Sequence, residues 1–375
     1  MSVRALLIYL CLAAPAFGQG FAGLGSEADG FSVPQPGTAF NFPADHGPHP
    51  GYRIEWWYLT ANLQAADGTD YGVQWTLFRS ALAPVERSGW SSPQLWMGHA
   101  GLTTQTHQFV DERMARGGIG QAGVTAAPFA AWIDNWQMAG RALPEADALS
   151  ALDLRAAGQA FSYELALDAK GPLVPQGVQG YSVKSEKGQA SYYYSQPFYH
   201  VTGTLTLPAG AIAVTGQAWL DHEWSSQPLA EDQTGWDWFS LHFDSGEKMM
   251  GFRLRDGGAG FTSATWIKAD GRPQPQAPGA LRVTPLETAA VAGRSVPIRW
   301  TQPLAEDQTG WDWFSLHFDS GEKMMGFRLR DGGAGFTSAT WIKADGRPQP
   351  QAPGALRVTP LETAAVAGRS VPIRW

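Results

Sequence analysis

Short segments rich in aromatic and β-branched residues follow one another along this chain, without long helical patterns between them. In one of them, Val73, Trp75 and Leu77 alternate with polar Gln74 and Thr76, close to the period of two of a strand. Gly, Pro, Asp or Ser bound the segments, which span residues 53–63, 71–80, 95–102, 130–138, 161–168, 200–207, 211–223, 235–243 and 248–255. The pattern predicts an antiparallel, all-β protein built as barrels or sandwiches.

The composition agrees with this class and excludes one group of partners. Charged residues make up 16% of the chain, which has 44 Gly, 26 Pro and 17 Trp. The net charge is −7 and no run of Lys and Arg occurs, so a nucleic-acid backbone has nothing to bind. We therefore expect no nucleic-acid partner.

The first eighteen residues have the features of a secretory signal. Arg4 precedes an apolar run, and the small residues Ala16 and Gly18 precede Gln19, where we expect cleavage. The only cysteine, Cys11, lies in this run, so the mature chain has no thiol for a disulfide or a metal. No later stretch has the roughly 18 apolar residues of a membrane span. We expect a secreted or periplasmic protein.

An exact internal repeat divides the C-terminal half. Residues 227–300 recur as residues 302–375, identical at all 74 positions. Repeats kept as structural units diverge, so a recent duplication or an artefact of sequence assembly fits better. We divide the chain into a signal (1–18), a flexible segment (19–37), a first domain (38–208), a partial second domain (209–300) and the duplicate (301–375).

The densest group of polar and aromatic residues spans positions 45–58. His46 and His49 have an H-x-x-H spacing, but Pro48 and Pro50 prevent a helix from stacking them, so we expect a loop hydrogen-bonded to a barrel rim rather than a metal site.

The chain is extended from Glu55, so Glu55 and Trp57 share one face and Trp56 and Tyr58 the other. If the first face is buried, the pKa of Glu55 should rise, unless an arginine such as Arg53, Arg79 or Arg116 neutralises it.

A second group combines acids with tryptophans. On a strand, Asp221 lies beside Glu223, with His222 and Trp224 on the opposite face. Downstream, Trp236 and Trp238 form an aromatic pair and Asp237 faces away. Such acids suit protonation of an alkene, with aromatic rings stabilising the cation, and they equally suit packing with a rim salt bridge.

A third aromatic stretch, residues 192–195, is interpreted as packing first and ligand contact second. No G-x-S-x-G elbow and no phosphate or dinucleotide fingerprint occurs, so a serine hydrolase is unsupported and we expect no cofactor.

These motifs together resemble the AttH-type lipocalin-like family of predicted secreted hydrolases, related to carotenoid 1,2-hydratase. The resemblance covers residues 38–300 and rests on the motifs at 45–58, 180–195, 219–226 and 235–239. It implies two consecutive lipocalin-like barrels, the second perturbed by the duplicate, a periplasmic or secreted location, and association with an ABC-transporter permease. His222 and Trp224 match an H-x-W element similar to that of the hydratases, which use no cofactor.

Three hypotheses follow. The first is a protein that binds a hydrophobic lipid or isoprenoid. The second is a cofactor-free hydratase or lyase in which Asp221, Glu55 or Asp237 is the acid, His222 shuttles or orients a proton, and Trp224 stabilises the cation. The third is an accessory component of a lipoprotein exporter. The expected ligand-binding residues are aromatic: Trp56, Trp57, Tyr58, Trp75, Trp219, Trp236 and Trp238.

Overall fold

The computed structural model describes residues 29–374 with internal gaps, at 142–144, 228–232, 234, 256–259, 284, 292–293, 301–309, 318–322, 331–336, 344–347, 351–361 and 367–368. The predicted signal and most of the segment 19–37 lie outside the described residues. In the described part of the chain, none of the helices is long and apolar enough to cross a membrane.

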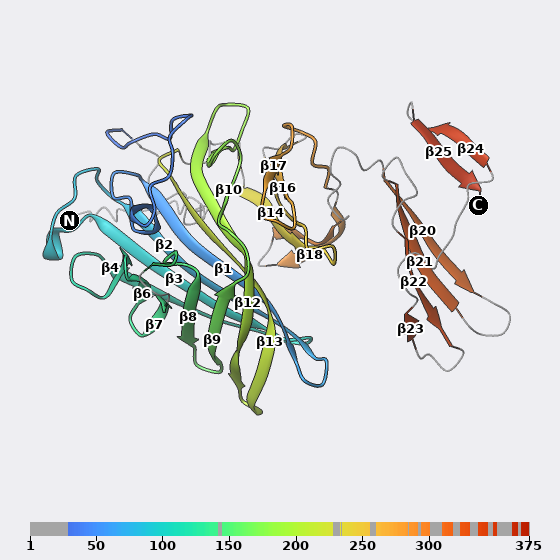
Figure 1. The fold of residues 1–375 in the computed structure, drawn as a ribbon, viewed down its shortest axis with the longest axis horizontal. Coiled ribbons are helices and arrows are strands. Elements are labelled where there is room, and N and C mark those ends of the chain that lie inside the picture. Colours follow the sequence, from blue (N-terminus) through green and yellow to red (C-terminus); the bar gives the residue numbers. More distant parts are fainter. Residues whose placement is uncertain are drawn as a thin grey trace, which may run out of the picture.

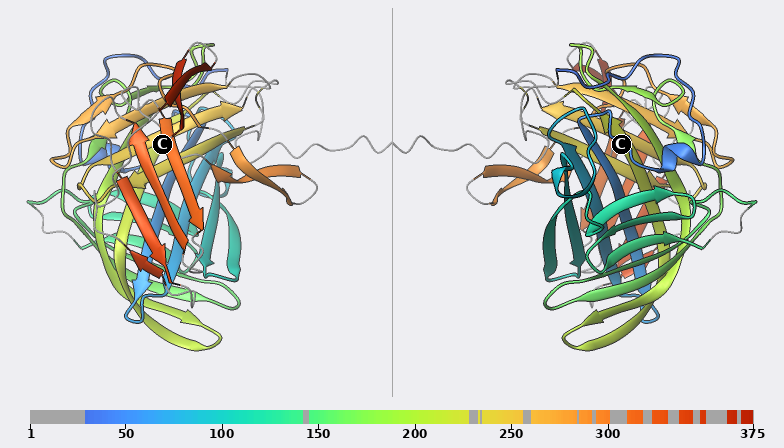
Figure 2. Two further views of the ribbon diagram at one scale, coloured as in Figure 1. Left: turned by 90° about the vertical axis from the view of Figure 1, so that its right-hand side faces the viewer. Right: turned by 90° about the vertical axis from the view of Figure 1, so that its left-hand side faces the viewer.

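One large antiparallel sheet forms a nearly closed barrel in the N-terminal half (Figures 1 and 2). Its strands run in the order β4-β3-β2-β1-β13-β12-β9-β8-β7-β6-β5, with β10 and β11 pairing with β12 at its side. The bounds are β1 Ile54–Ala65, β2 Asp70–Ala81, β3 Gln94–Thr103, β4 Gln108–Arg116, β5 Ala122–Ala126, β6 Phe129–Ile133, β7 Trp136–Gly140, β8 Ala151–Ala157, β9 Ser162–Ala169, β10 Val174–Pro175, β11 Tyr181–Val183, β12 Ala190–Leu207 and β13 Gly210–Ser225. Two short 3-10 helices, η2 (Ala44–His46) and η3 (Gly89–Ser91), lie in the connecting loops.

Alternation of side chains along the strands fills the barrel. On β1, Trp57, Leu59, Ala61 and Leu63 are buried in the interior. Their neighbours point outward, as the period of two requires. Because large aromatic and aliphatic side chains pack across the whole interior, this barrel has a solid core.

Two predicted boundaries differ from the structure. The segment 130–138 is a hairpin of β6 and β7, because Asp134 adopts a positive φ of 52° that aspartate tolerates in a turn. The predicted domain boundary at 208 falls in the turn of a long hairpin, where Leu207 pairs with Gly210. The change from the first sheet to the next therefore comes after Ser225.

A second sheet follows the barrel. It contains β14 (Gly235–His242), β15 (Lys248–Arg255), β16 (Phe261–Ile267) and β17 (Pro273–Pro275), and a separate hairpin of β18 (Pro285–Val291) and β19 (Arg294–Trp300) comes next. A small apolar core joins the second sheet to the outer face of the barrel: Val174, Tyr193, Phe198, Trp219, Met250, Phe252 and Ile267. The all-β class is thus confirmed, as a nearly closed barrel followed by a second sheet.

The duplicate repeats this local architecture. Its strands are β20 (Gly310–His317), β21 (Lys323–Arg330), β22 (Thr337–Ile342), β23 (Pro348–Pro350), β24 (Glu362–Val366) and β25 (Arg369–Arg374). Trp313 pairs with Phe327 in the register in which Trp238 pairs with Phe252. The strands of the duplicate pair only with one another among the described residues, and Figure 1 shows them apart from the barrel.

Candidate functional site

The strand β13 presents two different polar clusters on its two faces. It pairs with β1 on one side and with β12 on the other, so residues from all three strands contribute to each cluster. His222 and Trp224 face the barrel interior with Glu55 and Tyr194. Asp221 and Trp219 face the second sheet with Tyr193 and Ser195. We call these the inner network and the outer acid cluster.

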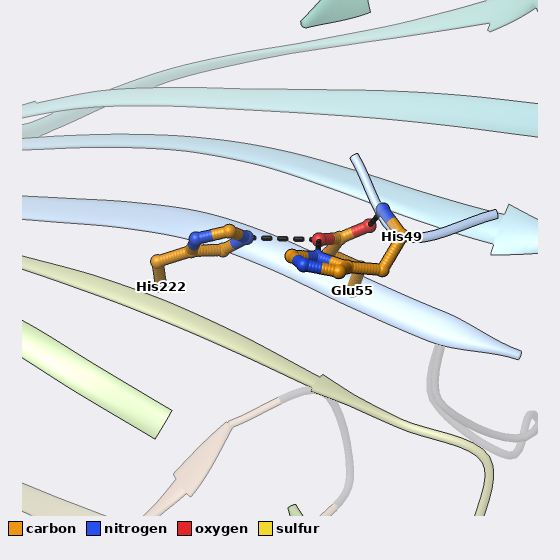
Figure 3. A group of neighbouring side chains, drawn as sticks. All are labelled: His49, Glu55 and His222. Atoms are coloured by element: carbon orange, nitrogen blue, oxygen red, sulfur yellow. Dashed lines mark hydrogen bonds and ion pairs between the residues drawn. The ribbon is translucent and has the colours of Figure 1, made fainter. Parts of the chain in front are cut away.

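Glu55 is the centre of the inner network (Figure 3). Its carboxylate lies 2.8 Å from Nε of Arg79, 2.9 Å from Nε2 of His222 and 2.6 Å from Nδ1 of His49. Burial favours the neutral acid, but the charges of Arg79 and His49 and the histidine hydrogen bonds hold the pKa of Glu55 well below its usual value. The expected rise in the pKa of Glu55 was therefore wrong, and the alternative of neutralisation by Arg79 is confirmed.

Hydrogen-bond counting fixes the protonation of His222. Burial lowers the pKa of His222 to about 4 despite the nearby carboxylate, so the ring is neutral at pH 7. Its Nε2 must donate to ionised Glu55, which leaves its Nδ1 without a proton, 2.9 Å from the hydroxyl of Tyr194. The ring stacks on Trp57 with centroids 4.5 Å apart, which leaves it little freedom.

The loop that precedes β1 closes over this network. The backbone N–H of His49 donates to Glu55, the His49 ring stacks on Trp224 at 3.9 Å, and its Nε2 lies 3.3 Å from Asp45. The charge of Glu55 and the hydrogen bonds to Asp45 and Glu55 raise the pKa of His49 to about 9 against the effect of burial. The expected loop, hydrogen-bonded to the barrel rim, is confirmed.

The same loop reaches a surface groove. His46 contacts Tyr194 at 2.8 Å and Asp147 at 3.2 Å. Asp147 also lines a groove of about 640 Å³ formed mainly by apolar side chains such as Phe42, Pro43 and Phe129.

In the inner network, the side-chain nitrogen and oxygen atoms of His49, Glu55 and His222 that could bind a metal ion lie within 4.8 Å of one another. Both carboxylate oxygens of Glu55 already accept hydrogen bonds from Arg79, His49 and His222. The three side chains are therefore held together by hydrogen bonds to this carboxylate.

Asp221 has a different environment in the outer acid cluster. The residue is 2% exposed, and its Oδ1 accepts hydrogen bonds from Ser195 at 2.5 Å, from Trp219 at 2.7 Å and from Tyr193 at 2.8 Å. No residue in the described ranges donates to Oδ2. Burial raises the pKa of Asp221 to about 7, because the three donors that oppose it are neutral and nearby Glu223 is an acid.

Aromatic rings from the barrel and the second sheet surround this acid. Trp238 donates to the hydroxyl of Tyr193 at 3.2 Å, and its ring meets those of Tyr58 at 5.5 Å and Trp219 at 6.3 Å. Trp236 stacks near Trp56 at 6.5 Å and is 41% exposed. We call five of these residues the outer aromatic face: Trp56, Tyr58, Trp219, Trp236 and Trp238. It is open to solvent at one edge and buried around Asp221.

The structure thus separates the residues predicted to act together. Glu55, His222 and Trp224 belong to the inner network, and only Asp221 belongs to the outer acid cluster. Asp237 lies on the far side of the second sheet, near Arg255 at 3.8 Å. Among the predicted ligand-binding residues, Trp57 and Trp75 are fully buried in the barrel core, whereas the other five form the outer aromatic face. The seven do not line one pocket.

Several residues of these clusters were not singled out from the sequence. Tyr193 and Ser195 lie in a stretch interpreted as packing, and their spacing of two, opposite Glu223 and Asp221 in the adjacent strand, is the signal that identifies their shared face. His242 and Lys248 carry no motif. Only the register of β14 and β15 brings them together.

Comparisons with known proteins agree with this architecture. A solved structure of an AttH-type protein from Nitrosomonas europaea is 26% identical, with a TM-score of 0.65, covering 85% of this chain and 97% of that one. Kievitone hydratase from Nectria haematococca is 15% identical, with a TM-score of 0.56 and coverage of 84% and 98%, which shows a shared fold. None of the curated proteins matches the chain. The sequence profile of the AttH-like family matches residues 33–302 and again residues 301–375, and the chain therefore belongs to the AttH-like family.

Proposed function

We propose that this protein binds an apolar, unsaturated molecule on the outer aromatic face and adds water to, or removes water from, one of its carbon–carbon bonds, with Asp221 as the acid. The observation that carries the proposal is the environment of Asp221. Its Oδ1 is fixed by three donors, its Oδ2 is left without one among the described residues, and aromatic rings surround it. A lipid or an isoprenoid is the ligand class that such a surface suits.

The chemistry needs no electron carrier. Protonated Asp221 transfers its proton to one alkene carbon, the π bond breaks, and the neighbouring carbon becomes a cation. The rings of Tyr58 and Trp238 stabilise that charge. Water then adds to the cation and returns a proton to the carboxylate, and the reverse sequence eliminates water. A pKa of about 7 leaves a substantial fraction of Asp221 protonated at neutral pH, as a general acid requires.

The inner network has a separate role in this proposal. Glu55 is held ionised by Arg79 and His49, so it is a poor proton donor at neutral pH. We assign it, with His222, to positioning: the network fixes β1 against β13 and so fixes Tyr58, which pairs with Asp221 across those strands. Secretion and association with a transporter permease remain predictions from the sequence.

The test is product analysis with purified protein. Squalene, farnesol and oleic acid are incubated with the wild type and with Asp221→Asn, and products heavier by one water are sought by mass spectrometry. The expected result is hydration by the wild type, declining as pH rises through about 7, and none by the variant.

Two outcomes would contradict the enzyme proposal. Unchanged turnover in Asp221→Asn would remove the acid from the mechanism. Bound ligand recovered intact from both proteins, with no product at any pH, would leave a binding protein whose aromatic face serves retention alone. Asn keeps the shape of Asp, so a folded variant is expected, and near-UV circular dichroism checks it.

A further inference from the structure

A buried lysine without an acid partner lies on the face of the second sheet that meets the barrel. Lys248 is 6% exposed, and its Nζ lies 5.0 Å from the centroid of the Phe198 ring. No carboxylate forms an ion pair with it in the described part of the chain. A buried ammonium is costly unless an anion compensates it, and burial accordingly lowers the pKa of Lys248.

Two acids are candidates for this role, one next to Lys248 in the sequence and one on the barrel face that it meets, and each pairs with another lysine. Glu247 points to the opposite face of the sheet, where it lies 3.0 Å from both Lys268 and Trp266. Glu223 pairs with Lys184, whose ammonium lies over the rings of Tyr193 and Phe252. The contrast is informative, because the half-buried Lys184 has a carboxylate partner whereas the buried Lys248 forms no ion pair among the described residues.

A neutral hydrogen-bond donor stands beside Lys248. His242 is its cross-strand partner, and burial together with the charge of Lys248 lowers the pKa of His242 to about 4. The His242 ring is stacked near Trp219, with centroids 5.8 Å apart, and Trp219 donates to Asp221. A continuous row of neighbouring side chains, buried between the second sheet and the barrel, therefore leads from Lys248 through His242 and Trp219 to the acid.

We propose that Lys248 and His242 form a subsite for the carboxylate of a long-chain unsaturated acid, whose apolar chain lies along Trp219 and Trp238 and brings a double bond to Asp221. This proposal rests on the proposed function and specifies its substrate class. One ammonium and one imidazole N–H match the single charge and two oxygens of a carboxylate. His242 lies four positions after Trp238 on β14, so the chain must span roughly 13 Å, at about 3.3 Å per residue.

The test compares an acid with its neutral counterpart on the full chain. Oleic acid and oleyl alcohol are titrated, and binding is followed by tryptophan fluorescence. The wild type is expected to bind oleate more tightly than the alcohol. Lys248→Met should weaken oleate binding roughly ten- to a hundredfold, the range of a charge-assisted hydrogen bond, and leave the alcohol unchanged.

Two further variants make the result specific. Lys268→Met removes the same charge from the same sheet at an ion pair with Glu247, and it should bind both probes as the wild type does. Lys248→Arg keeps the charge and should retain the preference for oleate. Thermal unfolding of each variant verifies that the fold is intact.

The possible outcomes separate this proposal from the proposed function. Equal affinity of the wild type for the two probes, no binding of oleate, or equal losses in Lys248→Met and Lys268→Met would each overturn the carboxylate subsite. Hydration of squalene by a wild type that binds oleate and oleyl alcohol equally well would overturn the subsite and uphold the enzyme. Oleate binding that depends on Lys248, with no hydrated product from any probe, would uphold the subsite and overturn the enzyme.

Discussion

Two buried carboxylates, on neighbouring strands and on opposite faces of the sheet, have pKa values shifted in opposite directions. Glu55 is fully buried and its pKa lies well below the usual value, whereas Asp221 is 2% exposed and its pKa is raised to about 7. Desolvation opposes ionisation of both groups. Glu55 is compensated by Arg79 and the His49 cation, while Asp221 receives hydrogen bonds from neutral groups only. The comparison shows that the charge of the partners, more than burial, decides which acid keeps its proton.

The largest expected effect comes from removing the cation beside Glu55. Arg79→Met leaves a buried carboxylate without its main partner, so we expect a loss of about 3–5 kcal/mol in the free energy of unfolding. Urea denaturation at pH 7 measures this loss. The double variant with Glu55→Gln removes the unpaired charge and should recover part of it. A loss below about 1 kcal/mol in Arg79→Met would show that His49 alone can balance Glu55.

Replacing Asp221 is expected to raise the free energy of unfolding, in contrast to the loss expected for Arg79→Met. Its folded pKa of about 7 lies above the unfolded value of 3.8, so the folded state binds more protons between these limits and stability falls as pH rises through this window. Asp221→Asn removes that penalty, and above pH 7 the variant should be the more stable by up to roughly 4 kcal/mol. Near pH 4 the two proteins should be alike. Denaturation at both pH values measures the difference, and a less stable variant at pH 8 would contradict the raised pKa.

The His49 cation produces a second pH window. Its folded pKa of about 9 lies above the unfolded value of 6.5, so its stabilisation is complete below pH 6.5 and is lost as pH rises to about 9. Over that window the wild type should lose up to roughly 3 kcal/mol that His49→Gln does not lose. His200→Gln, at an exposed position of β12, is the matched control. Parallel stability curves for the wild type and His49→Gln would place the charge that balances Glu55 on Arg79 alone.

The sequence was sufficient to predict the strands and which side chains share a face of a strand. It was insufficient to predict which side chains contact one another across different strands. Alternation predicted that Glu55 and Trp57 share a face and that Asp221 lies opposite His222, because the period of two is a local property. It could not place Arg79 beside Glu55, or Ser195 beside Asp221, because those contacts depend on the register of strands far apart in the chain. The same limit explains why Trp57 and Trp238 were both assigned to ligand binding although they lie on opposite sides of the sheet.

The smallest expected effect uses the duplicated segment as an internal control for the outer face. Trp238 and Trp313 have the same sequence surroundings and the same register, and Trp238 contacts the barrel through Tyr58, Tyr193 and Trp219. Trp238→Ala should lower the stability of the barrel by about 2 kcal/mol, less than a fully buried tryptophan, since the site is half-buried. It should also weaken binding of oleyl alcohol.

Trp313→Ala is the control. It should change the stability and the binding of oleyl alcohol little, within about 0.5 kcal/mol, because the strands of the duplicate pair only with one another among the described residues. Equal effects of the two variants would mean that both copies of the repeat contact the barrel. The pKa of Asp221 would then depend on which copy buries it.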